Sequence, residues 1–388
     1  MSSINFPIYL DNQSTTRTDP RVAEKIFPYL TGIYGNPSST HIFGNEARAA
    51  LSLSRHIIAA SLNTSSDDII FTGCASESIN LALKGIAESY FPQGKRRIIT
   101  TTIEHSATLD TLKSLRDQGV EVVYLPVNHE GLISTSNLES AITPDTLVVT
   151  VILANNEIGT IQDYRTIAEI CSSKNVPLHF DATQAVGKID FTSSFAGIKS
   201  PLLFSFSAHK FYGPKGIGGL FINRSKSAIK ITPQIEGGGQ ENGLRAGTEN
   251  LPYIAGMAEA LRLCCESMND ESSRIAALRD LFLANLAKAN IKFRLNGSLE
   301  NRIPHNLNIT FPGVPAVSLL KGAQEIAFST GSACSSKSAL PSHVLKTIGL
   351  TDAEMKSTVR IGLGRFNTEE EVNYCTSKFI KIINGLQE

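Results

Sequence analysis

The chain has 388 residues, with 36 lysines and arginines against 36 aspartates and glutamates, and 41% of its residues are hydrophobic. This length predicts two domains, or one large domain with an appendage. Because the formal net charge is zero, nucleic acid is a poor candidate partner. No apolar run reaches the roughly 20 residues that cross a bilayer, and the N-terminus shows no secretory leader, so we expect a cytoplasmic protein without a membrane partner.

Short β-branched runs alternate with helical patterns between residues 67 and 220. Such alternation predicts an α/β fold with a mostly parallel sheet. Ligands of such sheets bind at the carboxyl ends of the strands, so the residues that follow each run are candidate site residues. The expected strands are 68–72, 97–101, 121–125, 147–153, 177–180, 202–206 and 219–222, and the helices between them are 76–89, 107–118 and 165–173.

A glycine-rich loop over residues 237–247 leads into a helical stretch over about 252–289 that is expected to connect two domains. The remaining sequence predicts a smaller α+β unit. Its expected strands are 306–311, 326–329 and 358–363, and its expected helices are 314–321 and 368–386.

Lys210 stands directly after an apolar strand and before a glycine-rich loop. Desolvation in such a place lowers the pKa of a lysine toward that of a nucleophilic amine able to form a Schiff base. A surface loop lysine is an equally good interpretation of the position alone. A nucleotide-binding phosphate loop is not supported, because the Gly-Lys-Ser/Thr sequence is missing.

Other polar residues follow strands in the same way. Asp181 offers a carboxylate for a heterocyclic cation, or a cap for the next turn. Residues 73–78 open a helix, where backbone amides and the Ser76 hydroxyl suit a phosphate, or simply cap the helix. His105 is placed to stack on a planar ligand or relay protons, while Asn156 and Gln184 suit ligand oxygens; each has an alternative role in a cap or turn.

The six cysteines form neither a disulfide framework nor a metal-ligand pattern. Cys334 differs from the others because it lies in a polar segment over residues 329–338, where a reactive thiol is accessible. Arg360 lies in an apolar strand pattern, and its guanidinium suits a substrate carboxylate or a structural ion pair. Packing roles are expected for the cysteines in helical patterns, which are Cys171, Cys264, Cys265 and Cys375.

Taken together, these residues resemble a known family over nearly the whole chain. The sequence looks like a cysteine desulfurase of the nitrogen-fixation and iron–sulfur-cluster type, among the fold-type I, class V aminotransferase-like enzymes. The order and spacing of seven strings carry the resemblance: YLDNQSTT at 9–16, YGNPSS at 34–39, NNEIG at 155–159, DATQ at 181–184, SAHK at 207–210, RAGTEN at 245–250 and GSAC at 331–334.

The resemblance implies a pyridoxal 5'-phosphate cofactor in an α/β protein with a mostly parallel seven-stranded sheet. Residues 16–260 would form the large cofactor-binding domain, and residues 1–15 and 261–388 the small domain that carries the catalytic cysteine loop. Lys210 would bind the cofactor covalently, Asp181 would pair with its ring nitrogen, Gln184 would contact its phenolic oxygen and His105 would stack on the ring. The cofactor phosphate would be held by Ala75, Ser76, Ser207, His209 and, from the neighbouring subunit of a homodimer, Thr248.

The resemblance also implies the reaction. L-cysteine would become L-alanine, with Lys210 and His105 moving protons and with Asn156 and Arg360 binding the substrate carboxylate. Cys334 would take the sulfur as a persulfide and pass it to a sulfur-acceptor or iron–sulfur scaffold protein. The sequence departs from the family at residues 73–78, where Cys74 and Ser76 replace a glycine and a threonine; we expect Cys74 to have a packing role.

Three alternatives differ in function from this interpretation. A selenocysteine lyase or another class V enzyme would share the fold and the cofactor, although Cys334 favours sulfur transfer. A cofactor-free scaffold is disfavoured by the presence of Lys210 and Asp181. A dehydrogenase is disfavoured because no Gly-x-Gly-x-x-Gly follows the first strand of a βαβ unit.

Overall fold

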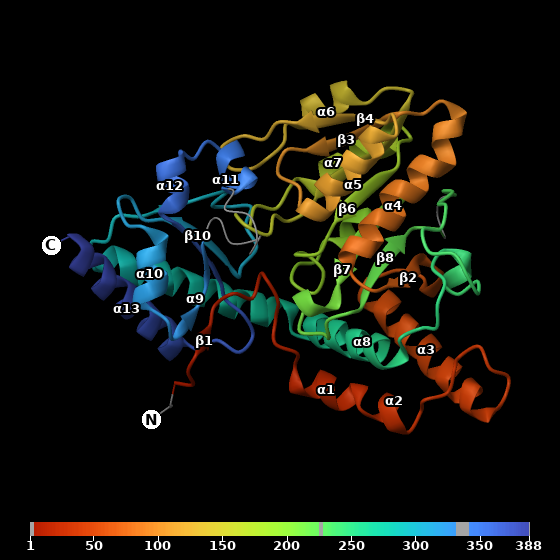
Figure 1. The fold of residues 1–388 in the computed structure, drawn as a ribbon, viewed down its shortest axis with the longest axis horizontal. Coiled ribbons are helices and arrows are strands. Elements are labelled where there is room, and N and C mark those ends of the chain that lie inside the picture. The colour runs from red at the N-terminus through yellow and green to blue at the C-terminus, as the bar shows by residue number, and fades with distance from the viewer. Residues whose placement is uncertain (1–3, 225–227, 331–340, 388) are drawn as a thin grey trace.

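The computed structural model describes residues 4–224, 228–330 and 341–387. Figure 1 shows a seven-stranded sheet with its helices on one side of the molecule and a four-stranded sheet with its own helices on the other. The N-terminal segment runs between the two, from β1 beside the small sheet to α1 beneath the large one (Figure 1). In the described part of the chain, none of the helices combines the length and the apolar character needed to cross a membrane.

The large sheet has the strand order β2-β8-β7-β6-β5-β3-β4. Only β8 runs antiparallel to its neighbours, so the sheet is mostly parallel and the predicted fold class is confirmed. Each predicted strand lies within one or two residues of the observed one. The strands are β2 Ile69–Thr72, β3 Arg97–Thr101, β4 Glu121–Leu125, β5 Thr146–Ile152, β6 Leu178–Asp181, β7 Leu202–Ser207 and β8 Gly218–Ile222.

Helices cover both faces of the large sheet, which is why β5, β6 and β7 are buried at every position and have no polar face. On one face, α4 Ala75–Tyr90 and α5 Ser106–Asp117 share a hydrophobic core with β2, β3 and β5. A second core is formed by five helices: α1 Pro20–Ile26, α3 Ile42–Ser61, α6 Thr135–Ala141, α7 Tyr164–Ser173 and α8 Leu251–Glu266.

The small sheet is antiparallel, with the order β12-β13-β10-β9. A separate parallel pair joins β1 Ile8–Tyr9 to β11 Ile326–Ala327. The other elements of this region are α9 Met268–Lys288, β9 Arg294–Leu295, β10 Asn306–Thr310, α10 Ala316–Gly322, β12 Ser329–Thr330, α11 His343–Thr347, α12 Asp352–Lys356, β13 Thr358–Gly362 and α13 Glu369–Gln387.

Two predicted elements are each divided in the structure. The helical stretch over 252–289 is two helices, which meet at Ser267, where φ is −110° and ψ is 9°. The strand expected over 326–329 is β11 and β12, since Ile326 pairs with β1 whereas Ser329 pairs with β13. The helices α1, α2 Pro28–Thr31, α3, α6, α11 and α12 were not predicted.

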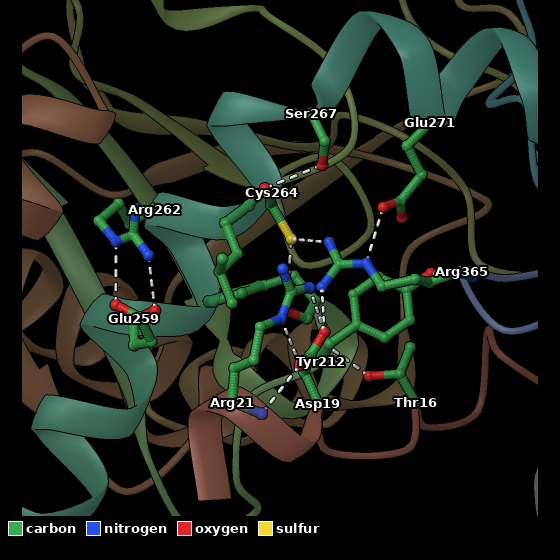
Figure 2. Close-up of polar contacts among 12 residues, drawn as sticks. Thr16, Asp19, Arg21, Tyr212, Glu259, Arg262, Cys264, Ser267, Glu271 and Arg365 are labelled. Carbon is green, nitrogen blue, oxygen red and sulfur yellow. Dashed lines mark hydrogen bonds and ion pairs between the residues drawn. The ribbon is translucent and has the colours of Figure 1, made fainter. Parts of the chain in front are cut away.

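One arginine joins elements from four parts of the chain. Arg365, which follows β13, donates to Asp19 Oδ2 at 2.9 Å and to Glu271 Oε2 at 2.7 Å, as Figure 2 shows. Its guanidinium lies 4.2 Å from the centre of the Tyr212 ring. Asp19 caps α1 and is buried, and the guanidinium groups of Arg21 and Arg365 hold the pKa of its carboxyl well below the usual value.

We predict that Arg365→Met lowers the free energy of unfolding by about 3 kcal/mol, because the buried Asp19 carboxylate and the half-buried Glu271 carboxylate lose a partner. The matched control is Arg262→Met. Among the residues that the structure describes, Arg262 forms ion pairs with Glu259 and Glu266 of its own helix, and its side chain is 39% exposed, so the expected loss is below about 1 kcal/mol. Urea unfolding measures both, and equal losses would contradict the structural role given to Arg365.

Candidate active site

A cavity of about 390 Å³ lies at the carboxyl ends of β5, β6 and β7. Thr248 is exposed and does not line it, and Cys334 lies outside the described residues. All the other predicted site residues line it, namely Ala75, Ser76, His105, Asn156, Asp181, Gln184, Ser207, His209, Lys210 and Arg360.

Lys210 is a cavity residue and not a lysine of the outer surface. Its Nζ donates to the carbonyl oxygens of Gln13 at 2.9 Å and Ser14 at 2.7 Å. Both carbonyls belong to the N-terminal segment, which closes this side of the cavity. The amine is thus held in place by neutral acceptors, and an amine in a partly desolvated site is suited to condense with an aldehyde.

Asp181 and Gln184 lie beside each other at the end of β6 and in the turn after it. Asp181 is 3% exposed, and its Oδ1 accepts from the Thr183 backbone N–H at 3.0 Å, so it caps the turn and also borders the cavity. Gln184 Nε2 donates to the Gln13 carbonyl oxygen at 2.9 Å, and its Oε1 accepts from Lys188 Nζ at 3.1 Å. Both predicted roles of Asp181 are therefore compatible with one position.

The start of α4 borders the cavity and suits an anion. The helix begins at Ala75, one residue before the predicted start, with Cys74 in the N-cap position, and the Cys74 side chain forms no capping hydrogen bond. Glu77 accepts instead from the Gly73 N–H at 2.7 Å, and the Ala75 N–H donates to Ser207 Oγ at 3.3 Å. The N-terminal backbone amides and the helix dipole favour a phosphate at this position.

Two histidines line the cavity, His105 at the start of α5 and His209 directly after β7. His105 is the N-cap residue of α5, where Nδ1 accepts from the Ala107 N–H at 3.1 Å, so the helix cap fixes the ring that borders the cavity. His209 Nδ1 lies 3.0 Å from Thr15 Oγ1. Burial, with smaller contributions from the positive charges of Lys210, Lys215 and Lys188, lowers the pKa of His209 to about 4, so its ring is neutral at neutral pH.

Arg360 borders the cavity from β13 of the small sheet, and Asn156 borders it from the loop after β5 of the large sheet. The Arg360 side chain is 5% exposed and forms an ion pair of 3.0 Å with Asp11, which is one of its two predicted interpretations. It also donates to Ser14 Oγ at 2.6 Å and to the Asn156 carbonyl oxygen at 3.2 Å. Because the guanidinium also lines the cavity, it is positioned to bind a carboxylate there.

The sequence interpretation missed the N-terminal segment as part of the site. Gln13 and Ser14 line the cavity, and the Gln13 side chain is 1% exposed with no hydrogen-bond partner for either amide atom among the described residues. Thr183 Oγ1 is a second buried cavity atom without a described partner. Such unsatisfied polar atoms are characteristic of a site built for a polar ligand.

The cavity residues fit pyridoxal phosphate in three independent respects. Lys210 supplies an amine for the aldehyde, Asp181 supplies a carboxylate for the ring nitrogen, and the N-terminus of α4 supplies amides for the phosphate. These groups surround a single cavity, so one ligand can meet all of them.

Glu104 is a fully buried acid beside His105. Its Oε1 accepts from Thr101 Oγ1 at 2.6 Å and from the Ile152 N–H at 2.8 Å. Burial, opposed in part by these hydrogen bonds, raises its pKa from 4.5 to about 8. The carboxyl is therefore protonated at neutral pH, so it adds no negative charge next to Asp181.

Comparisons with known proteins agree with this geometry. Residues 8–375 match the family described as Aminotransferase class-V. A cysteine desulfurase IscS of Serratia proteamaculans is 45% identical over 99% of this chain and 95% of its own length, and one of Neisseria meningitidis is 44% identical over 100% and 94%.

Solved structures are similar as well. A NifS-like protein superposes with a TM-score of 0.89 at 38% identity, covering 97% of this chain and 99% of its own. A structure titled "SspA in complex with cysteine" superposes with a TM-score of 0.81 at 35% identity, covering 93% and 100%.

The protonated state of Glu104 leads to a prediction about pH. The folded protein retains a proton that the unfolded chain releases above pH 4.5, so this group makes the free energy of unfolding fall as pH rises from 4.5 to about 8. In Glu104→Gln, which keeps the shape and stays neutral, this fall is absent. Urea unfolding is measured at two pH values in this interval. The free energy of unfolding of the variant, relative to that of the wild type, should increase by about 1.4 kcal/mol per pH unit. A difference that stays constant with pH would contradict the assignment.

Proposed function

The chain belongs to the class V aminotransferase family, and we infer that it is a cysteine desulfurase that uses pyridoxal phosphate. The observation that carries this inference is the grouping of an amine, a carboxylate and a guanidinium around one cavity. They are Lys210 for the cofactor aldehyde, Asp181 for its ring nitrogen and Arg360 for the carboxylate of an amino-acid substrate.

We propose that the cofactor is held by residues of both sides of the cavity. Lys210 binds it covalently, and the amides at Ala75 and Ser76, with Ser207 and His209, receive its phosphate. His105, whose orientation is fixed by its bond to the Ala107 N–H, would contact the ring. Gln184 would bind the phenolic oxygen.

The bound cofactor supplies an electron sink for the bond that breaks at the substrate α-carbon. Asp181 holds the proton on the ring nitrogen that makes this withdrawal effective. The Lys210 amine would remove the α-proton of the substrate and return one, with His105 as a second proton carrier. Arg360 and Asn156 orient the substrate through its carboxylate.

We propose that Cys334, which lies outside the described residues, accepts the sulfur. Its thiolate attacks the sulfur of L-cysteine; the S–S bond forms as the C–S bond breaks, and the electron pair goes to the substrate carbon. That carbon takes up a proton, so L-cysteine and one thiol yield L-alanine and one persulfide, without an outside oxidant. A sulfur-acceptor or iron–sulfur scaffold protein then removes the outer sulfur.

We also propose that the protein acts as a homodimer in the cytoplasm. Exposed apolar side chains gather on α1 to α3, including Phe27 and Tyr34 at 65% and Ile42 at 63%, and such a group favours association. Thr248 is exposed and outside the cavity of its own chain, which suits a contribution to the cavity of a second copy. Light scattering should give twice the 41.9 kDa chain mass.

We predict that Cys334→Ala retains the visible absorbance of the cofactor but forms alanine from L-cysteine at least about 100-fold more slowly, because no thiolate attacks the substrate sulfur. The half-buried Cys265 provides the matched control, since Cys265→Ala should leave the rate unchanged. Alanine formation and sulfide release measure both variants. Undiminished turnover in Cys334→Ala would disprove the persulfide assignment.

A further inference from the structure

A chain of hydrogen bonds connects Lys188, outside the cavity, to the amine of Lys210 inside it. Lys188 Nζ lies 3.1 Å from His305 Nε2 and donates to Gln184 Oε1 at 3.1 Å. Gln184 Nε2 then donates to the Gln13 carbonyl oxygen at 2.9 Å, and Lys210 Nζ donates to the same oxygen at 2.9 Å. Lys188 is therefore connected to the candidate cofactor lysine through two intermediate residues, although it does not line the cavity itself.

Lys188 is buried in an environment that does not favour its charge. It is 9% exposed, and no carboxylate of the described ranges forms an ion pair with it. Burial, together with a smaller contribution from the charge of Lys210, lowers its pKa from 10.5 to about 7, although Cys264 and Glu271 partly oppose the shift. Burial also holds the pKa of His305 well below its usual value, so that ring is neutral and accepts from Lys188. An unpaired buried lysine is costly, which calls for a function.

The partners of Gln184 determine which way its amide points. An ammonium group only donates hydrogen bonds, and a backbone carbonyl only accepts them. With Oε1 toward Lys188 and Nε2 toward the Gln13 carbonyl, both contacts are favourable. Rotating the amide by half a turn would set donor against donor and acceptor against acceptor. Lys188 therefore favours the orientation in which the Nε2 group of Gln184 faces the Gln13 carbonyl oxygen.

We propose that Lys188 is a positioning residue, which fixes the amide of Gln184 so that it offers an N–H to the phenolic oxygen of the cofactor. This inference rests on the proposed function, since it assigns Gln184 to that oxygen. An N–H donor stabilises the ionised form of the oxygen, whereas an amide oxygen would repel it. Lys188 thus acts on the cofactor through another side chain, from a place that substrate does not reach.

Loss of Lys188 should change how the bound cofactor responds to pH. The visible absorption of the cofactor bound to Lys210 reports the proton on the Lys210 nitrogen. When the N–H donor is lost, the ionised oxygen is less stable and holds that proton more strongly, so the pH midpoint rises. The other charged or titratable groups around Lys188, which are Lys210, Cys264, Glu271 and His305, are unchanged by the substitution.

The test is Lys188→Met, which keeps the length of the side chain but removes its donors. We expect the pH midpoint of the visible absorption to rise by about half a unit, and the dissociation constant of pyridoxal phosphate to increase on the order of tenfold. Lys199 is an exposed lysine nearby in the sequence, and Lys199→Met should change neither quantity. Lys188→Gln, which keeps an N–H donor, should restore part of the wild-type midpoint and serves as the test variant if Lys188→Met does not fold.

The positioning role is separated from a structural one by repeating the substitution in a Gln184→Leu background. There, removal of Lys188 should move the midpoint by less than half as much, because only direct repulsion between Lys188 and Lys210 remains. Equal shifts in both backgrounds, or no shift in either, would overturn the inference while leaving the function intact. A wild-type protein that takes up no coloured cofactor would overturn the proposed function and the inference together.

Discussion

The carbonyl group of Gln13 accepts hydrogen bonds from both Lys210 and Gln184, and the arrangement of the site depends on the segment that carries it. That segment is attached at both ends. Asn12 donates to the Gly362 carbonyl oxygen of the small sheet at 3.2 Å, and the Thr16 N–H donates to the carbonyl oxygen of His209, beside Lys210, at 2.9 Å. A short stretch of backbone therefore sets the position of the amine relative to the small sheet, where Arg360 lies.

The chain has no net charge, but it places three charged side chains around one cavity, where a single ligand can meet all of them. Arg360 is held by Asp11, Lys210 by neutral carbonyls, and Asp181 by a backbone N–H of its own turn. The buried acid nearby, Glu104, is neutral at neutral pH and does not compete with Asp181.

Much of the fold follows from the sequence because the central strands are buried on both faces and read as continuous apolar runs. Asp181, Gln184 and Lys210 were located by one rule, that ligands meet the carboxyl ends of parallel strands. Gln13 escaped this reasoning because it acts through Gln184 and Lys210, which lie more than about 170 residues away in the chain. Lys188 escaped it because it does not line the cavity and acts through Gln184, four residues before it. The break at Ser267 is a local change of the backbone dihedral angles, which periodicity does not reveal. Among the cysteines, burial raises the pKa of Cys171, Cys264 and Cys375 to about 12, in keeping with the packing roles expected of them.

The central claim is that this cavity converts L-cysteine to L-alanine and leaves the sulfur on the chain. Its most direct test is a single-turnover incubation of the protein, loaded with pyridoxal phosphate, with L-cysteine and no acceptor. Alanine is quantified, and the persulfide is labelled and located by peptide mass. The account predicts one alanine per persulfide, with the label on the peptide that contains Cys334. Alanine accompanied by a label on another cysteine, or no alanine at all, would contradict it.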